Sequence, residues 1–179
     1  MKFSLSAVAS VGAILIATAA AQITPPFYLQ AFRAGIPFPR DRVSASFSNL
    51  WVDRFGSQNA TCEGPDRGYA NFYLEGERLH LLSPPGVTQL VFTDRSGFGR
   101  GQIGYLTNPT EIPPRFEVDG WHFDANRDLH FRGQNLIACE GGPSGGWNLR
   151  LDVGIIEPGC IGVRVHSTDE PVPIVCIYH

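Results

Sequence analysis

The segment from residue 129 to residue 165 constrains the fold most, because apolar residues alternate there with polar or small ones along four short runs. Side chains of a β-strand point to opposite faces with a period of two, so each run predicts a half-buried strand. The alternating residues are Leu129 and Phe131, Leu136 and Ala138, Trp147, Leu149, Leu151 and Val153, and Ile161, Val163 and Val165. Turn-forming glycine and proline separate the runs, at Gly133 and at residues 141–146 and 158–159. We interpret this segment as a rigid β-scaffold.

Short runs of the same kind precede this segment. The predicted strands are residues 27–33, 43–52, 69–74, 78–82, 88–93, 102–107, 116–118 and 121–125. After residue 21, the 3.6-residue period of an amphipathic helix is not sustained over ten or more residues anywhere. We therefore predict an all-β, single-domain fold over residues 22–179, a disulfide-stabilised β-sandwich or β-barrel of about ten short antiparallel strands.

Three of these assignments depend on local signals. Residues 43–52 alternate apolar residues with serines and predict one continuous strand, whose serine face is either solvated or packed under a loop. The glycine at the centre of residues 75–77 predicts a tight hairpin turn. The Asp-Gly pair at residues 119–120 predicts another hairpin, between the strands on either side of it.

The N-terminus has the organisation of a secretory signal peptide. Lys2 precedes an apolar run over residues 3–16, and an Ala-x-Ala site ends at Ala21. This arrangement is too short and wrongly flanked for a membrane span. We therefore predict a signal peptide over residues 1–21 and a soluble, secreted mature chain from Gln22 that does not span a membrane.

Loss of the signal peptide makes the chain more acidic. Lys2 is the only lysine, so the 14 basic residues fall to 13 arginines against 17 acidic residues, a net charge of −4. The arginines are dispersed among acids instead of forming a basic block. Since phosphate backbones and anionic lipid surfaces are bound by clustered positive charge, we expect neither nucleic acid nor a membrane surface as a partner.

Four cysteines lie in the mature chain, and an even number in a secreted protein predicts two disulfides. Of the three possible pairings, we favour Cys139 with Cys160 and Cys62 with Cys176. A zinc site is the rival interpretation, but the chain has no C-x-x-C or H-x-x-x-H spacing, so we expect no metal. Asn59 begins an Asn-Ala-Thr glycosylation sequon directly before Cys62, which predicts a surface loop there.

The densest group of chemically reactive side chains lies in residues 121–132. A three-residue loop at 126–128 would place the aromatic residues on one face and set Asp124 opposite His130, and His122 opposite Arg132, on the other. Such a face can support acid–base chemistry or weak metal binding, although most faces of this composition are simply solvated. We interpret His122, Asp124 and His130 as a candidate binding surface.

The glycine-rich segment 94–101 supplies a second candidate surface. It lacks the Gly-Lys-Ser/Thr of a phosphate-binding loop, and we interpret it as a mobile hairpin loop that presents Arg95, Phe98 and Arg100. The pattern does not pair carboxylates for glycoside hydrolysis, and the flexible turn around Ser144 is the opposite of the strained elbow of a serine hydrolase. We therefore predict a protein that is not an enzyme, without catalytic residues or a cofactor.

Several short sequences of the mature chain carry a family resemblance. They are FYLQAFRAG at residues 27–35, QLVFTDRSG at 89–97, GQIGY at 101–105, LIAC at 136–139, Trp147 with its strand, and GCIGV at 159–163. In these sequences the chain resembles the phialide-type fungal cell-wall proteins, also known as IgE-binding allergens, and related elicitors of the plant hypersensitive response. That family often has a second cysteine soon after the position of Cys62, whereas this chain carries Cys176 instead.

The resemblance implies a non-enzymatic extracellular protein, associated with the fungal wall or released, and detected in some relatives by plant immunity. We accordingly expect a non-catalytic, wall-associated or effector-like monomer, with elicitor activity as one possible outcome. Its expected partner is a cell-wall polysaccharide or a host surface receptor. The alternative is a lectin-like carbohydrate-binding module or a carbohydrate-active enzyme acting on wall polysaccharide.

Overall fold

The computed structural model describes residues 22–179 with the exception of residues 36–37, 55, 57, 143–144 and 156. The predicted signal peptide, residues 1–21, lies outside the described residues, as do Pro143 and Ser144 of the predicted turn. The strands of the described part are β1 (Phe27–Phe32), β2 (Ser44–Ser46), β3 (Asn49–Val52), β4 (Ala60–Cys62), β5 (Asn71–Glu75), β6 (Arg78–Leu81), β7 (Gln89–Asp94), β8 (Gln102–Thr107), β9 (Trp121–Phe123), β10 (Leu129–Phe131), β11 (Leu136–Cys139), β12 (Trp147–Leu151), β13 (Cys160–Asp169) and β14 (Cys176–Tyr178). Within the described residues, no helix has the length and apolarity needed to cross a membrane.

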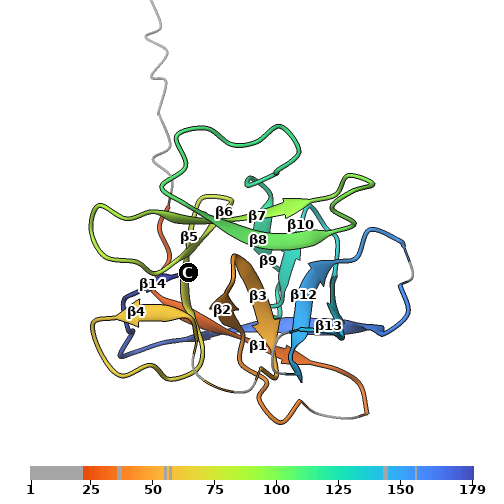
Figure 1. The fold of residues 1–179 in the computed structure, drawn as a ribbon, viewed down its shortest axis with the longest axis horizontal. Coiled ribbons are helices and arrows are strands. Elements are labelled where there is room, and N and C mark those ends of the chain that lie inside the picture. Colours follow the sequence, from red (N-terminus) through yellow and green to blue (C-terminus); the bar gives the residue numbers. More distant parts are fainter. Residues whose placement is uncertain (1–21, 36–37, 55, 57, 143–144, 156) are drawn as a thin grey trace, which may run out of the picture.

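Ten of these strands form one antiparallel sheet that curves into a barrel (Figure 1). Its strand order is β11-β13-β1-β5-β6-β7-β8-β12-β3-β2, and a further pairing of β12 with β11 closes eight of the strands into a ring. Closure leaves these eight strands without a continuous free edge, which removes the usual site of edge-to-edge aggregation. The predicted all-β class and disulfide-stabilised barrel are therefore confirmed.

The narrowest joint of the ring lies between β8 and β12, where one residue pair, Gln102 with Arg150, is in register. Gly101 sits beside this pair with a φ of 80°, and its carbonyl oxygen accepts a hydrogen bond from the Leu151 N–H at 2.7 Å. A Cβ atom at residue 101 would lie 2.1 Å from the Leu151 carbonyl oxygen. Glycine is therefore required for the two strands to approach closely enough to close the barrel.

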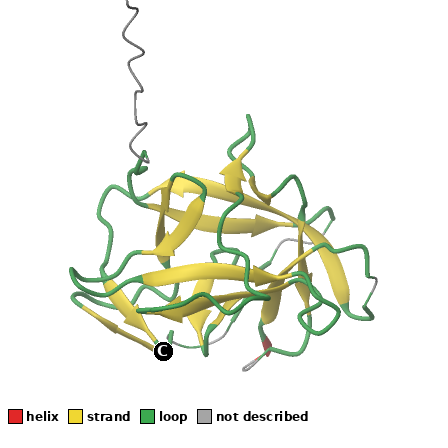
Figure 2. Cartoon of the chain, turned by 90° about the horizontal axis from the view of Figure 1, so that it is seen from above, coloured by secondary structure: helices red, strands yellow, loops and turns green. Residues whose placement is uncertain are grey.

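The inward-facing half of each alternating pattern fills the barrel interior. Leu29 and Ala31 of β1 are fully buried, and so is Leu149 of β12, whereas Gln30 faces outward and is partly exposed. Figure 2 shows strands on opposite sides of this interior. Since burial of one large apolar side chain is worth roughly 1.5–3 kcal/mol, this continuous cluster is the main stabilising feature of the fold.

Two smaller strand pairs complete the barrel. In the β9–β10 pair, the fully buried rings of Trp121 and Phe131 pack edge to face with their centres 4.9 Å apart. In the β4–β14 pair, Tyr178 is buried and its backbone is held by the side chain of Gln89. Gln89 Nε2 donates to the Tyr178 carbonyl oxygen at 2.7 Å, and its Oε1 accepts from the Tyr178 N–H at 2.9 Å. The C-terminal strand is thereby fastened to β7 of the barrel.

Residues 108–120 cover the outer face of β7 and β8. The Phe116 ring stacks on that of Phe92 with centres 3.8 Å apart, in a second apolar cluster on the outside of the barrel. The predicted hairpin at residues 119–120 is wrong, because Glu117 forms a β-bridge with Thr93 and not with the strand that follows it. Packing of an aromatic side chain on β7 outweighs the local turn preference of the Asp-Gly pair.

The predicted single strand over residues 43–52 is also wrong, since β2 and β3 form a hairpin with a tight turn between them. Phe47 and Ser48 occupy the turn with φ angles of 53° and 55°, outside the β region. Phe47 is 49% exposed although the alternation placed it inside. Ser46 is buried on the serine face, where its hydroxyl accepts a hydrogen bond from the Asn59 N–H at 2.8 Å. Hydrogen bonding thus offsets the cost of burying a polar side chain.

The two disulfides are those favoured from the sequence. Cys139–Cys160 joins directly opposed residues of β11 and β13 and spans 21 positions of the sequence. Cys62–Cys176 joins opposed residues of β4 and β14 and spans 114 positions. The first reinforces an existing ladder of the barrel, whereas the second ties the C-terminal strand to a distant part of the chain.

Candidate binding surface

The β9–β10 hairpin carries the three polar side chains singled out in the sequence, but in a different register. His130 lies opposite His122, and Leu129 lies opposite Phe123, so the connecting loop spans five residues, 124–128. The predicted pairs Asp124 with His130 and His122 with Arg132 are therefore wrong. The Asp124 side chain explains the longer loop, because its Oδ1 accepts the backbone N–H groups of Asn126 at 2.8 Å and Asp128 at 2.9 Å.

His122, Asp124 and His130 nevertheless lie together on the outer face of the hairpin. The two imidazole rings have centres 5.8 Å apart, and His130 Nε2 lies 3.6 Å from Asp124 Oδ2. Nδ1 of His122 contacts the Gly120 carbonyl oxygen at 3.1 Å. The pKa of Asp124 is held below its usual value, first by the backbone N–H of Asp128 and also by the neighbouring His130. The carboxylate is thus a fixed negative charge beside two imidazoles.

Strand β13 extends this face with residues that the sequence interpretation missed. Asp128 is buried, its Oδ1 lies 3.2 Å from His166 Nδ1, and its Oδ2 lies 3.3 Å from Arg164 Nε. Arg127 pairs with Asp169 at the end of the same strand. Alternation of Arg164 and His166 with apolar residues was visible in the sequence as an outward-facing row. The approach of β10 to β13 was not, because it depends on a long-range contact.

We define the histidine face as His122, Asp124 and His130 of the hairpin together with Asp128, Arg164 and His166. Imidazole, carboxylate and guanidinium groups are planar donors and acceptors, and they suit hydrogen bonding to hydroxyl groups. Their mutual pairing holds them in position before a ligand arrives, which lowers the entropy lost on binding.

Of the three residues predicted to lie at the surface of the loop at residues 94–101, Arg95 and Arg100 form ion pairs and Phe98 faces solvent. Arg95 makes a bidentate ion pair with Glu117, with both N–O distances 2.7 Å, and Arg132 approaches the same carboxylate at 2.9 Å. The Arg95 ion pair is the main reason why the pKa of Glu117 is lowered. Phe98 is 88% exposed at the tip of the loop. The loop therefore presents one aromatic ring above a charged base.

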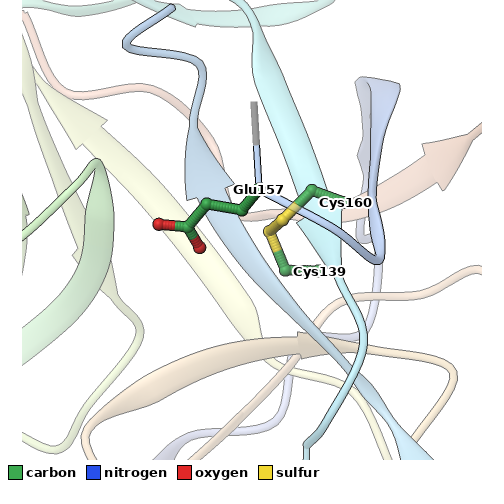
Figure 3. Close-up of side chains that lie close together, drawn as sticks. All are labelled: Cys139, Glu157 and Cys160. Atoms are coloured by element: carbon green, nitrogen blue, oxygen red, sulfur yellow. A yellow bond between two sulfur atoms is a disulfide. The ribbon is translucent and has the colours of Figure 1, made fainter. Parts of the chain in front are cut away.

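Arg100 pairs with Glu157. Figure 3 shows that Glu157 lies beside the Cys139–Cys160 disulfide. Glu157 accepts a hydrogen bond from Arg100 at 3.1 Å and another from Arg150 at 2.7 Å. Ligand-type atoms of Cys139, Glu157 and Cys160 lie within 4.8 Å of one another, a spacing compatible with a metal site. The two sulfurs are joined in a disulfide and offer no thiolate, while both carboxylate oxygens serve arginines. This group fits a cross-link beside an ion pair better than a metal centre.

The predicted glycosylation site lies at the surface. Asn59 is exposed and directly precedes β4, and Thr61 of the sequon is exposed as well. The backbone carbonyl of Asn59 accepts a hydrogen bond from the His179 N–H at 2.7 Å, so the main chain is fixed while the side chain faces solvent. Glycosylation at Asn59 stays a prediction.

Comparison with known proteins gives the family. The model of the PhiA-like secreted protein family matches residues 27–179. The cell wall protein phiA of Aspergillus fumigatus is 34% identical over 97% of both chains, and that of Emericella nidulans is 36% identical over 97% of this chain and 98% of its own. The cell wall protein phiA of Arthroderma benhamiae is 38% identical over 87% of this chain and 89% of its own. No solved structure matches the chain. These near full-length matches confirm the resemblance, and the chain belongs to the PhiA-like secreted protein family.

Proposed function

We propose that this protein is a non-catalytic component of the fungal cell wall that binds wall polysaccharide through the histidine face. Its relatives are cell wall proteins that match it over nearly their whole length. The observation that carries the binding role is the mutual pairing of the face, in which Asp128 holds both His166 and Arg164 in place. A surface of fixed hydrogen-bonding groups on a closed barrel suits recognition of a polymer outside the cell.

The electrostatics of this region favour binding over acid–base catalysis. A general acid or base works best with a pKa near the operating pH and with a proton free to exchange with the substrate. The pKa of Asp124, a carboxylate of the histidine face, is instead lowered, first by the backbone N–H of Asp128. Asp124 therefore remains ionised and engaged at neutral pH, as expected of a fixed charge that orients a ligand.

Co-sedimentation with insoluble wall polysaccharides, such as chitin and β-glucan, tests this proposal when it is combined with an assay for released reducing ends. We expect retention of the protein without release of reducing ends. The His122→Ala/His130→Ala double variant should lose several-fold in retention, whereas His179→Ala, which removes an exposed histidine elsewhere, should bind normally. Equal retention of all three proteins would refute the histidine face. Reducing-end release that depends on Asp124 would favour the carbohydrate-active enzyme instead.

A second proposed role is recognition by plants as an elicitor, which the exposed loop at residues 94–101 favours. Phe98 projects at its tip with 88% of its surface accessible, and an isolated aromatic side chain of this kind is a common anchor in protein recognition. Infiltration of purified protein into leaves should cause cell death with the native form. Phe98→Ala should weaken the response, while Phe47→Ala, at another exposed phenylalanine, should not. Absence of cell death with native protein, or full activity of heat-inactivated protein, would reject a role for the folded loop.

A further inference from the structure

A cavity of about 510 Å³ lies between the loops that precede β2 and β5 and the segment that follows β3. Arginines dominate its lining, which contains Arg40, Arg42, Arg54 and Arg67 together with the acids Asp41 and Asp66. Four of the 13 arginines of the mature chain thus meet in one place, although the chain as a whole carries more acidic than basic residues. We call this feature the arginine cavity. Its charge favours a negatively charged ligand.

The two acids of the cavity are satisfied by neighbouring groups of the protein. Asp66 accepts the backbone N–H groups of Gln58 and Gly68, each at 2.8 Å. Asp41 accepts a hydrogen bond from Gln30 Nε2 at 3.0 Å. These carboxylates are thereby engaged with the surrounding loops. Two of the arginines are engaged as well, since Arg40 pairs with Asp53 at 3.6 Å and Arg67 with Glu170 at 3.3 Å.

Arg42 is held by aromatic rings. Its guanidinium carbon lies 4.6 Å from the centre of the Tyr28 ring and 4.4 Å from that of Tyr69. In the described part of the chain Arg42 has no ion-pair partner, whereas Arg67 contacts Glu170 at 3.3 Å. Ring contacts position a guanidinium without occupying its N–H donors, and these donors can therefore bind an anion.

We propose that the arginine cavity binds an oxyanion carried by a saccharide, either a uronate carboxylate or a sugar phosphate. The guanidinium group of Arg42 presents paired N–H donors that match two oxygens of such an anion. The Tyr28 and Tyr69 rings pack against this guanidinium and against each other, which holds its donors in place for the anion. This inference adds a class of ligand, the saccharide oxyanion, to the proposed wall-binding function. It rests on that function for the assumption that a wall polysaccharide carries the anion.

Titration of the unmodified mature protein with small sugars tests the cavity directly. NMR chemical shifts should be followed with glucuronate, glucose 6-phosphate, inorganic phosphate and neutral glucose. We expect the two sugar anions to shift the Arg42 side-chain and Tyr69 amide resonances, with weaker binding in high salt, and glucose to leave them unchanged. Phosphate binding as tightly as glucose 6-phosphate would overturn the saccharide part, and shifts that are absent or lie elsewhere would overturn the whole proposal.

Substitutions add a second test. Arg42→Gln should weaken glucuronate binding about tenfold, as expected for loss of a charge-assisted hydrogen-bond pair. Arg115→Gln is the matched control, because Arg115 is also an exposed arginine over an aromatic ring, that of Phe98. Equal loss in both variants would indicate a general charge effect and reject the cavity. If a folded Arg42→Gln variant is retained by cell-wall polysaccharide as well as the native protein, the arginine cavity is not the site that contacts the polysaccharide. If the unmodified protein does not bind the polysaccharide at all, only the proposed wall-binding function is rejected.

Discussion

The two disulfides should stabilise the protein unequally, and the difference follows from the loops they close. In the chain-entropy treatment, a cross-link removes conformational freedom from the unfolded chain, and the effect increases with the logarithm of loop length. The separation of 114 positions between Cys62 and Cys176 corresponds to about 4.8 kcal/mol, and the separation of 21 between Cys139 and Cys160 to about 3.3 kcal/mol. Since small domains are stable by ~5–15 kcal/mol, loss of the first bond removes a large share of the total.

The surrounding structure reinforces this order. Cys139 and Cys160 lie in β11 and β13, which are also held together by backbone pairing that begins at Leu136 opposite Val163. This pairing does not depend on the disulfide. Cys62 and Cys176 belong to a separate two-stranded sheet with three residue pairs. Removal of the Cys62–Cys176 disulfide therefore loosens a weaker element than removal of the Cys139–Cys160 disulfide.

Urea denaturation of two double variants, Cys62→Ala/Cys176→Ala and Cys139→Ala/Cys160→Ala, measures both contributions with the same substitution chemistry. We expect the first variant to lose about 1.5 kcal/mol more free energy of unfolding than the second, a difference resolved by midpoints measured at equal slope. An equal loss, or a larger loss for the Cys139/Cys160 variant, would refute the argument from loop length.

Three further predictions concern packing and protonation. Gly104→Ala should cost roughly 1–3 kcal/mol in urea denaturation, because its Cβ atom would lie 2.6 Å from a carbonyl oxygen of the β2–β3 turn, whereas Gly162→Ala, with nothing within 4 Å, should not. Glu117 has a pKa lowered by Arg95, so its stabilising effect is present at neutral pH and is lost as pH falls through its folded pKa; Glu117→Gln should lower stability by about 0.5–1 kcal/mol at pH 7 and flatten that acid dependence. Burial lowers the pKa of His80 from 6.5, so the unfolded chain takes up a proton first and stability should fall as pH drops below 6.5; His80→Phe should abolish this slope, and a persistent slope would assign it to another group.

Elements whose apolar residues alternate and end at clear turns were predictable from the sequence. The runs beginning at Leu129, Leu136, Trp147 and Ile161 form β10, β11, β12 and half of β13, because strands of a barrel have one buried and one exposed face. The same pattern suggested the Cys139–Cys160 disulfide, because Cys139 ends one of these runs and Cys160 precedes another. The single strand predicted over residues 43–52 is wrong because the apolar alternation continues through Phe47, which turns outward in the structure. In addition, the buried Ser46 is stabilised by a hydrogen bond that the sequence pattern does not reveal.

Features that depend on distant segments were not predictable. The five-residue loop at 124–128 depends on the hydrogen bonds of the Asp124 side chain, so the register of the β9–β10 hairpin was not predictable. The proximity of His122, Asp124 and His130 was predicted from the alternation alone. The arginines of the cavity looked dispersed in the sequence, since Arg40, Arg42, Arg54 and Arg67 alternate with acids. Only the arrangement of three separate segments around one hollow turns them into a positively charged site.

The Cys62–Cys176 disulfide should also support the arginine cavity, which gives a final prediction. The segment between Cys62 and β5 carries Arg67 and Tyr69, and both contact Glu170, which precedes Cys176 in the chain. The bond thus connects the two chain segments that form this side of the arginine cavity. A cavity whose lining is fixed in advance loses less conformational entropy when a ligand binds. Glucuronate titration of the two double alanine variants under native conditions should show weaker binding for Cys62→Ala/Cys176→Ala and native binding for Cys139→Ala/Cys160→Ala. Native affinity in the first variant would mean that the hydrogen bonds of Glu170 organise the cavity without the disulfide.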